Sequence, residues 1–367
     1  MFKSICRNYS FFAEIIIKYI EGVIPLFINN RKKPYALLFY EALFRNLKEQ
    51  YRENNAIISG YKKEKAGYDG ECNVDYKLAT YPHKKDFFPI KGIRLENPPF
   101  HFQTDTLLPT RKFFSIFEIK NLKGKVTYDS KQHQFTQEYK GETTAYKDPI
   151  LQAEAQKSHL QMLLESKGIY GIPIETVVVI AYPTTIFENF HQDPYVYEKI
   201  IHTESLHQHL DKLNNKYTRE HLTFPALKKI QSSLLRANTP LRSNPLNNFN
   251  LEDKHFIKGI ACSVCNHYPL QRVYKKWLCP RCKHISFDAH VRKILDYFLI
   301  HGTTITNRQC RELLQIGSGR TANVCLNSMD LSVTGDNKGR KYHSPRISDF
   351  PQDSVFPYIK NITKEID

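Results

Sequence analysis

Glu118 and Lys120 stand two positions apart at the end of a strand-like apolar run that begins at Phe113. Side chains two apart on a strand point to the same side, so this carboxylate and this ammonium group share one face. A second acid, Asp105, lies in the preceding strand-like segment, where an acidic side chain is costly unless it is paired. Two carboxylates and a lysine in this arrangement are typical of a divalent-metal phosphodiesterase site.

Phosphodiester hydrolysis needs a metal ion, a water molecule and groups that hold both in place. Mg²⁺, or Mn²⁺ in its place, prefers hard oxygen ligands in near-octahedral geometry. We therefore predict Asp105, Glu118 and the backbone carbonyl of Ile119 as ligands of a catalytic metal ion. Lys120 is predicted to orient or deprotonate the attacking water and to offset negative charge on the phosphate.

The elements that must position these residues are also predicted from the sequence. Glu71 is expected on a helix over about 64–76, and Gln152 on a helix that begins after Asp148 and runs through Leu164. Both side chains are predicted to reach the same site. Strands are expected at 86–95, 101–108, 113–120 and 176–181, with a turn at 109–112, a short strand pair within 126–135 and further helices at 35–50 and 205–235.

The tripeptide Glu-x-Lys alone does not identify a catalytic site. It recurs at Glu138–Lys140, Glu165–Lys167 and Glu252–Lys254, where an exposed pair on the surface is the simpler interpretation. Two features favour Glu118 and Lys120: they lie in a strand rather than in a loop, and the strand before them offers a partner acid.

Four motifs that follow one another between Gly67 and Gln152 resemble a known family. They are Gly67-Tyr68-Asp69-Gly70-Glu71, Gln103-Thr104-Asp105-Thr106-Leu107-Leu108, Phe117-Glu118-Ile119-Lys120-Asn121-Leu122-Lys123-Gly124 and Asp148-Pro149-Ile150-Leu151-Gln152. In this order they look like the nuclease-related domain (NERD) family of the restriction-endonuclease-like, PD-(D/E)XK fold group. The upstream segment 31–34 of this chain also resembles the start of the domain in bacterial members of the family. The resemblance implies a metal-dependent nuclease core whose site contains Glu71, Asp105, Glu118, Lys120 and Gln152, although Asp148 stands where many relatives have asparagine.

Four of the eight cysteines form two C-x₂-C pairs, Cys262 with Cys265 and Cys279 with Cys282. Four thiolates at this spacing predict a tetrahedral structural Zn²⁺ site in a zinc ribbon. A redox pair is a weaker interpretation because both pairs share one short segment, and an iron–sulfur cluster stays open at this point. The remaining cysteines are scattered, which favours a reducing cytoplasm over a disulfide framework.

The formal net charge of +16 predicts a polyanionic partner, with nucleic acid ahead of an anionic membrane surface. Between Gln271 and Lys341, 13 lysines and arginines stand against 5 acidic residues. Basic residues beside the expected ribbon are therefore predicted to bind a nucleic-acid backbone together with Trp277, unless the ribbon only braces the next module. They are Arg272, Lys275, Lys276 and Arg281.

Three short helices and a basic hairpin are predicted after the ribbon. The helices are expected at 291–300, 306–314 and 320–329, and the hairpin at 331–342. This pattern is typical of a winged helix-turn-helix, which binds DNA or, alternatively, protein. In the DNA-binding reading Ser318, Arg320, Thr321 and Asn323 would face the groove, and Lys338, Arg340 and Lys341 would contact phosphate.

The N-terminal segment contains an apolar stripe over 11–23 that predicts an amphipathic helix. Glu14, Lys18 and Glu21 interrupt it, so a membrane span is not expected, and packing on the protein or on a second copy is favoured over a peripheral membrane role. We therefore expect this region to be a site at which a homo-oligomer can form. We expect the protein itself in the cytoplasm.

Together these patterns predict an α/β protein: a restriction-endonuclease-like core of a mixed sheet flanked by helices, followed by a zinc ribbon and a winged-helix-like module. The expected bounds are 1–59 for an N-terminal helical extension, 60–205 for the NERD nuclease domain, 206–255 for a helical connector and linker, 256–286 for the ribbon and 287–367 for the DNA-binding module and tail. The expected function is metal-dependent cleavage of nucleic acid, DNA in the first place, in plasmid or phage defence as the family resemblance implies. The alternative is a non-cleaving DNA-binding regulator on a nuclease-like fold.

Overall fold

The computed structural model describes residues 31–83 and 87–353, apart from the side chain of Lys338. The helix expected over 11–23 therefore lies outside the described residues. The chain forms two compact units. Among the described residues, unit 1 combines Arg31 with those of the range 70–238, and unit 2 combines residues 32–69 with residues 239–353.

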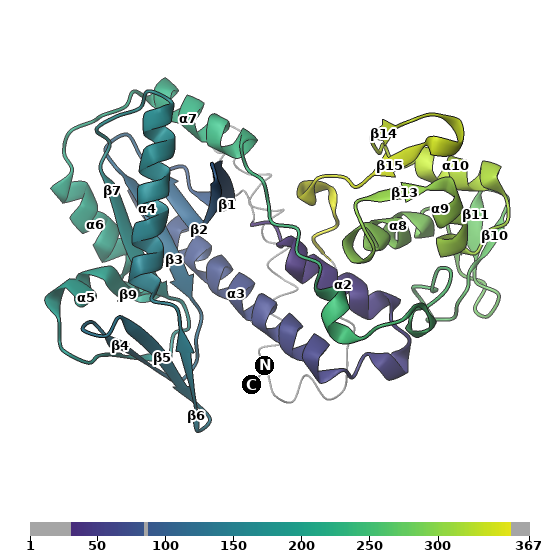
Figure 1. The fold of residues 1–367 in the computed structure, drawn as a ribbon, viewed down its shortest axis with the longest axis horizontal. Coiled ribbons are helices and arrows are strands. Elements are labelled where there is room, and N and C mark those ends of the chain that lie inside the picture. The colour runs from purple at the N-terminus through teal and green to yellow at the C-terminus, as the bar shows by residue number, and fades with distance from the viewer. Residues whose placement is uncertain (1–30, 84–86, 354–367) are drawn as a thin grey trace. The chain divides into compact units, whose positions relative to one another are not determined.

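Unit 1 is built on a five-stranded mixed sheet (Figure 1). Its strand order is β1 (Ile90–Asn97), β2 (Phe100–Pro109), β3 (Phe114–Lys120), β7 (Ile174–Ile180) and β9 (Ile200–His202). The first three strands are antiparallel neighbours, whereas β3, β7 and β9 run parallel. The buried β-branched run of β7 lies beside β3, so the expected strands at 113–120 and 176–181 are confirmed.

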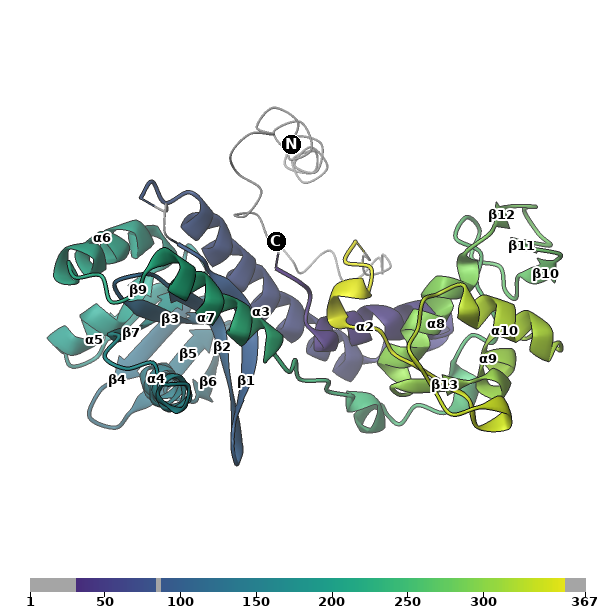
Figure 2. The same ribbon diagram turned by 90° about the horizontal axis from the view of Figure 1, so that it is seen from above.

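Helices cover both faces of this sheet, which confirms the expected flanked mixed sheet (Figure 2). α4 (Pro149–Ser166) and α7 (Phe224–Arg236) pack on one face, while α6 (Leu206–Lys216) and the part of α3 (Asn55–Ala79) from Gly70 onward pack on the other. In β3, Phe114 and Ile116 face α4, and Phe117 and Ile119 face α3. The alternation places Glu118 and Lys120 on the α4 side.

Three strands of a second sheet lie between β3 and α4 in the chain, and its fourth strand follows β7. Its order is β6 (Glu142–Tyr146), β5 (Gln134–Tyr139), β4 (Lys125–Asp129) and β8 (Ile186–Asn189), followed by α5 (Pro194–Lys199). Val126, Tyr128 and Phe135 are buried in one cluster with Ile150 of α4 and Val196 of α5. The sequence predicted the β4–β5 pair, whereas β6 and β8 were not expected.

Unit 2 gathers α2 (Tyr35–Asn46), the first part of α3, the ribbon and the C-terminal module around one hydrophobic cluster. The ribbon strands are β10 (Gln271–Val273), β11 (Lys276–Leu278) and β12 (Ile285–Ser286). The module follows as α8 (Ala289–Ile300), β13 (Thr304–Thr306), α9 (Asn307–Leu314), α10 (Gly319–Asn327), β14 (Val333–Thr334) and β15 (Lys341–His343). Its sheet order, β13-β15-β14, together with three helices, is the winged-helix arrangement that the sequence predicts. No helix of the described residues has the length and apolar character needed to cross a membrane.

Candidate active site

β3 and α4 bring three of the predicted residues into direct contact. Lys120 Nζ lies 2.7 Å from Glu118 Oε1 and donates a hydrogen bond of 3.2 Å to Gln152 Oε1. The other carboxylate oxygen, Glu118 Oε2, accepts a 2.7 Å hydrogen bond from Gln156 Nε2. Gln152 and Gln156 are one helical turn apart, so α4 presents both amides to the end of β3. Glu118 is only 2 % exposed, and this ring of donors offsets the cost of burying it.

Asp105 joins the site where β2 and β3 separate. Their ladder ends at the pair Thr106 and Phe117, and beyond it Asp105 Oδ2 accepts the backbone N–H of Ile119 at 2.8 Å. The N–H and C=O of one strand residue point to the same edge. The Ile119 carbonyl is therefore directed to the side of β3 on which Asp105 lies.

Glu71 is held at the site by Arg31. Arg31 Nη1 forms a 2.7 Å ion pair with Glu71 Oε2 and also donates to the Asp105 carbonyl at 2.9 Å. The same guanidinium binds both oxygens of Asp75 at 3.0 Å and Thr106 Oγ1 at 2.7 Å. With its side chain 3 % exposed, Arg31 links the helix that carries Glu71 to the strand that carries Asp105.

Gly92, beside this guanidinium, has a backbone conformation that favours glycine. It stands opposite Asp105, between the paired residues Lys91 and Ile93, and has a φ of +59°. A Cβ at this position would lie 3.4 Å from Arg31 Nη1, which is an ordinary contact distance. A residue with a side chain would, however, have to adopt a backbone conformation that L residues rarely take. The positive φ, rather than a lack of space, therefore favours glycine where Arg31 reaches the Asp105 carbonyl.

The acidic groups perturb one another. Burial, followed by the charges of Glu118 and Glu71, raises the pKa of Asp105 well above its usual value, although the Ile119 N–H and Lys120 oppose the shift. Burial also raises the pKa of Glu71, and Asp75 and Glu118 add to the effect while Arg31 opposes it. Burial acts to lower the pKa of Arg31, yet Glu71, Asp75 and Asp105 together raise it. A cation near these carboxylates would relieve this repulsion.

The donors present fit a magnesium or manganese ion. The Asp105 and Glu118 carboxylates and the Ile119 carbonyl are hard oxygen ligands, and a raised carboxylate pKa marks a place where positive charge is favourable. The structure thus places Glu118, Lys120 and Gln152 together through direct contacts, Asp105 through the Ile119 backbone, and Glu71 through Arg31.

Sequence reasoning missed three residues of this network. Arg31 was singled out only as part of the segment 31–34, and it contacts residues 40 to 75 positions away, which no local pattern reveals. Asp75 lies four residues after Glu71, so the helical spacing alone places it on the same face. Gln156 has the same relation to Gln152, and that spacing was the signal available for it.

Close packing around Gly70 explains why a glycine precedes Glu71 in the first motif. A Cβ built on Gly70 would lie 2.4 Å from Asn121 Cβ and 3.3 Å from Ala181 Cβ. The helix therefore approaches the ends of β3 and β7 at a distance that only glycine permits. A Cβ built on Gly67 would meet no described atom within 4 Å, so the two glycines of the motif differ in their packing.

The four cysteines of the ribbon form a metal-binding group. Their sulfurs all lie within 4.8 Å of one another, and the pairs Cys262–Cys282 and Cys265–Cys279 are each 3.6 Å apart. A tetrahedral Zn²⁺ site with Zn–S bonds of about 2.3 Å requires sulfurs about 3.8 Å apart. The cluster therefore fits Zn²⁺, as the sequence predicted.

The basic residues around the ribbon are placed unevenly. Lys275 and Arg281 are exposed, and Lys276 is half-buried. The expectation that Trp277 contributes to a binding surface is wrong, because the indole is fully buried and donates from Nε1 to His290. Arg272 is half-buried, with its guanidinium 5.0 Å from the centre of the Trp277 ring.

In the winged-helix module, Ser318 caps the N-terminus of α10 and Arg320 is exposed in its first turn. Asn323 is exposed and accepts a hydrogen bond from Asn307, whereas Thr321 is half-buried. Arg340 and Lys341 are exposed at the hairpin, and the side chain of Lys338 lies outside the described part.

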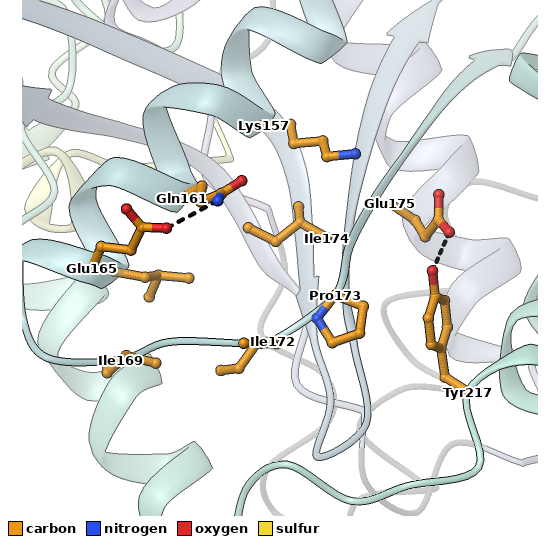
Figure 3. A pocket seen from close by; sticks show the side chains of 11 residues that line it. Lys157, Gln161, Glu165, Ile169, Ile172, Pro173, Ile174, Glu175 and Tyr217 are labelled. Atoms are coloured by element: carbon orange, nitrogen blue, oxygen red, sulfur yellow. Dashed lines mark hydrogen bonds between the residues drawn. The ribbon is translucent and has the colours of Figure 1, made fainter.

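A pocket of about 290 Å³ lies elsewhere in unit 1 (Figure 3). Its lining includes Ile174 and Glu175 at the start of β7 and Glu165 near the end of α4. The candidate site lies at the opposite ends of β3 and α4, so this pocket is separate from it.

Comparison with known proteins identifies the segment that contains the site. The sequence profile of the nuclease-related domain family, NERD, matches residues 66–181. This segment is a NERD domain. No curated protein and no solved structure matches the chain. The NERD match spans Glu71 to Gln152, and Arg31 lies outside it although it binds within the same site.

Proposed function

We propose that this protein is a metal-dependent nuclease that hydrolyses phosphodiester bonds, with DNA as the substrate. The nuclease-related domain supports nuclease chemistry in general. The single observation that carries the finer proposal is the Lys120 ammonium, held between Glu118 and Gln152 beside the Asp105 carboxylate.

In this proposal Asp105, Glu118 and the Ile119 carbonyl would hold Mg²⁺ or Mn²⁺. Such an ion supplies Lewis-acid stabilisation of charge on the phosphate and lowers the pKa of a bound water. Lys120 Nζ retains donor capacity beyond its contacts with Glu118 and Gln152, because an ammonium group has three protons. It would donate to the attacking water or to a phosphate oxygen as negative charge develops there.

Gln152 and Gln156 would act by fixing these groups. Gln156 holds one oxygen of Glu118 and leaves the other for Lys120, which restricts how the carboxylate can rotate. Gln152 holds Lys120 from α4, and Arg31 holds Glu71 against the Asp105 backbone. Rigid support of this kind reduces the reorganisation needed when the substrate binds.

Unit 2 would dock the substrate. The exposed Arg320, Arg340 and Lys341 of the winged-helix module, and Lys275 and Arg281 of the ribbon, are suited to phosphate contacts. We also propose phosphate contacts for three residues on the basis of the sequence alone. They are the half-buried Arg272 and Lys276, and Lys338. A role in plasmid or phage defence rests on the family resemblance alone.

The test is cleavage of a supercoiled plasmid and of circular single-stranded DNA with Mg²⁺, with Mn²⁺ and without added metal. We expect metal-dependent nicks or breaks that disappear in Lys120→Met, while that variant still binds Mn²⁺ in calorimetry. Absence of cutting by the wild type, together with tight salt-sensitive binding, would instead support the non-cleaving regulator.

A further inference from the structure

The segment β4–β6 joins the end of β3 to the start of α4, the two elements that carry Glu118, Lys120 and Gln152. Its first strand begins at Lys125, shortly after Lys120, and its third strand ends at Tyr146, two positions before Asp148. Asp148 caps α4 through the N–H groups of Ile150 and Leu151. Both ends of the β4–β6 segment are therefore attached next to elements that carry the candidate site.

The inner half of this sheet is fixed by packing. Phe135 is fully buried against Tyr128, and its cross-strand partner on β6 is Tyr146. Residues 135, 137 and 139 alternate with their neighbours, so Tyr139 lies on the same face as Phe135 and Tyr146. The face that is buried near α4 thus continues outward along the hairpin as two tyrosines.

These two tyrosines are exposed but not loose. Tyr139 and Tyr146 are each 38 % exposed, and every residue of β6 is exposed. A Cβ on Gly124 would lie 3.1 Å from the Tyr139 ring, so this ring rests on the backbone that follows β3. Gln137 connects the parts: it accepts from the Tyr146 hydroxyl and donates to the Lys123 carbonyl, both at 2.8 Å.

Lysines accompany the rings. Lys140 Nζ lies 5.6 Å from the centre of the Tyr139 ring, and Lys123 Nζ lies 5.2 Å from that of Tyr182. Lys147 is exposed directly after β6. Exposed tyrosine rings with ammonium groups nearby, alongside Glu138 and Glu142, fit a chain that offers flat bases along a phosphate backbone.

We propose that the Tyr139–Tyr146 face of the β5–β6 hairpin binds an unpaired nucleic-acid strand and leads it to the site at Glu118. The proposal rests on the proposed function and adds a substrate class, namely DNA or RNA with single-stranded character next to the cut. The choice of an unpaired strand follows from the rings, because a base can stack on tyrosine only when it has left its own helix. The lysines would contact phosphates of any sequence.

The experiment measures binding rather than cleavage, so its outcome is independent of whether the protein cuts. Fluorescence anisotropy in buffer without added Mg²⁺ compares labelled oligothymidine, oligouridine and a DNA duplex of equal length. The variants are Tyr139→Leu, Tyr146→Leu and their combination, with Tyr170→Leu as the matched control. Tyr170 is 70 % exposed and follows the opposite end of α4.

We expect each hairpin variant to weaken oligothymidine binding about ten-fold, within the range that base–aromatic stacking contributes, and to leave duplex binding unchanged. Lys140→Gln should lower the salt slope of single-strand binding by about 0.7. Preference between oligothymidine and oligouridine would assign the source of the strand. Unchanged single-strand affinity, or equal losses for duplex and single strand, would overturn the proposal. Unchanged binding with loss of a dimer in size-exclusion chromatography would reassign the face to a second copy of the chain.

Discussion

Replacing Gly70 with alanine tests whether the close approach of α3 to β3 positions Glu71. A Cβ at residue 70 would lie 2.4 Å from Asn121 Cβ, the carbon nearest to that residue's backbone. Rotation of the Asn121 side chain cannot move this atom, so the helix or the end of β3 must shift. Gly67→Ala is the matched control, because a Cβ there would meet no described atom within 4 Å.

The magnitude follows from two opposing terms. Alanine is favoured over glycine inside a helix by about 1 kcal/mol, and both variants gain this amount. Overpacking against a fixed neighbour costs roughly 1–3 kcal/mol, and only Gly70→Ala incurs it. Gly70→Ala should therefore be less stable than Gly67→Ala by roughly 1–3 kcal/mol. A displacement of Glu71 by about 1 Å would also lower cleavage by on the order of 100-fold.

The assay pairs urea unfolding followed by circular dichroism with initial rates of plasmid cleavage. Gly67→Ala should be about 1 kcal/mol more stable than the wild type and should cut at the wild-type rate. Gly70→Ala should be less stable than Gly67→Ala and should cut more slowly. Equal stability and equal rates in the two variants would refute the argument that the contact with Asn121 sets the position of Glu71.

Three further predictions concern buried charge and the metal-binding ribbon. Arg31→Met should lower the free energy of unfolding by roughly 3–5 kcal/mol, because it leaves buried carboxylates unpaired, and adding Asp75→Asn should restore part of the loss in the same urea assay. Chelation of zinc, or Cys279→Ser, should shift the emission of Trp277 to the red, since this single tryptophan is fully buried two residues from Cys279; unchanged emission and melting would contradict a structural zinc site. Burial lowers the pKa of Lys293 to about 8, with Asp296 opposing, so the unfolded state holds more protons between about pH 8 and its ordinary value of 10.5. Stability should thus rise with pH across this window, by roughly 3 kcal/mol in total, and Lys293→Met should remove that rise in unfolding curves measured at several pH values.

Much of the site could be predicted from the sequence because its parts are local patterns. The run from Phe114 to Lys120 is apolar apart from Ser115, Glu118 and Lys120. Its strand character, and hence the shared face of Glu118 and Lys120, followed from this pattern. Asp148 and Pro149 are strong helix-start signals, and the cap forms as expected. The spacing of the cysteines sufficed for the ribbon.

Other elements could not be predicted because their environment comes from distant residues. The helix expected over 64–76 is α3, Asn55–Ala79, which buries Ile57 and Tyr61 in unit 2 but Val74 and Leu78 in unit 1. Its apolar residues therefore do not form one continuous stripe. β6 is exposed throughout and has no apolar alternation to reveal it.

Trp277 shows the opposite error. Lysines and arginines surround it in the sequence, which suggested an exposed aromatic, but in a ribbon this small the tryptophan serves as the core. Its partners Cys262 and Cys279 lie in the same cluster, together with residues of α2 and α8. Composition alone does not distinguish these two environments.

The most direct test of the central claim compares two Glu-x-Lys sites in one chain. Glu118→Gln preserves size and removes the charge of the predicted metal ligand, whereas Glu165→Gln makes the same change at a half-buried residue of α4 that lines the separate pocket. Plasmid cleavage with Mg²⁺ should be lost in Glu118→Gln and unchanged in Glu165→Gln, with both proteins folded by circular dichroism. Cleavage by Glu118→Gln at the wild-type rate would contradict the assignment of the site.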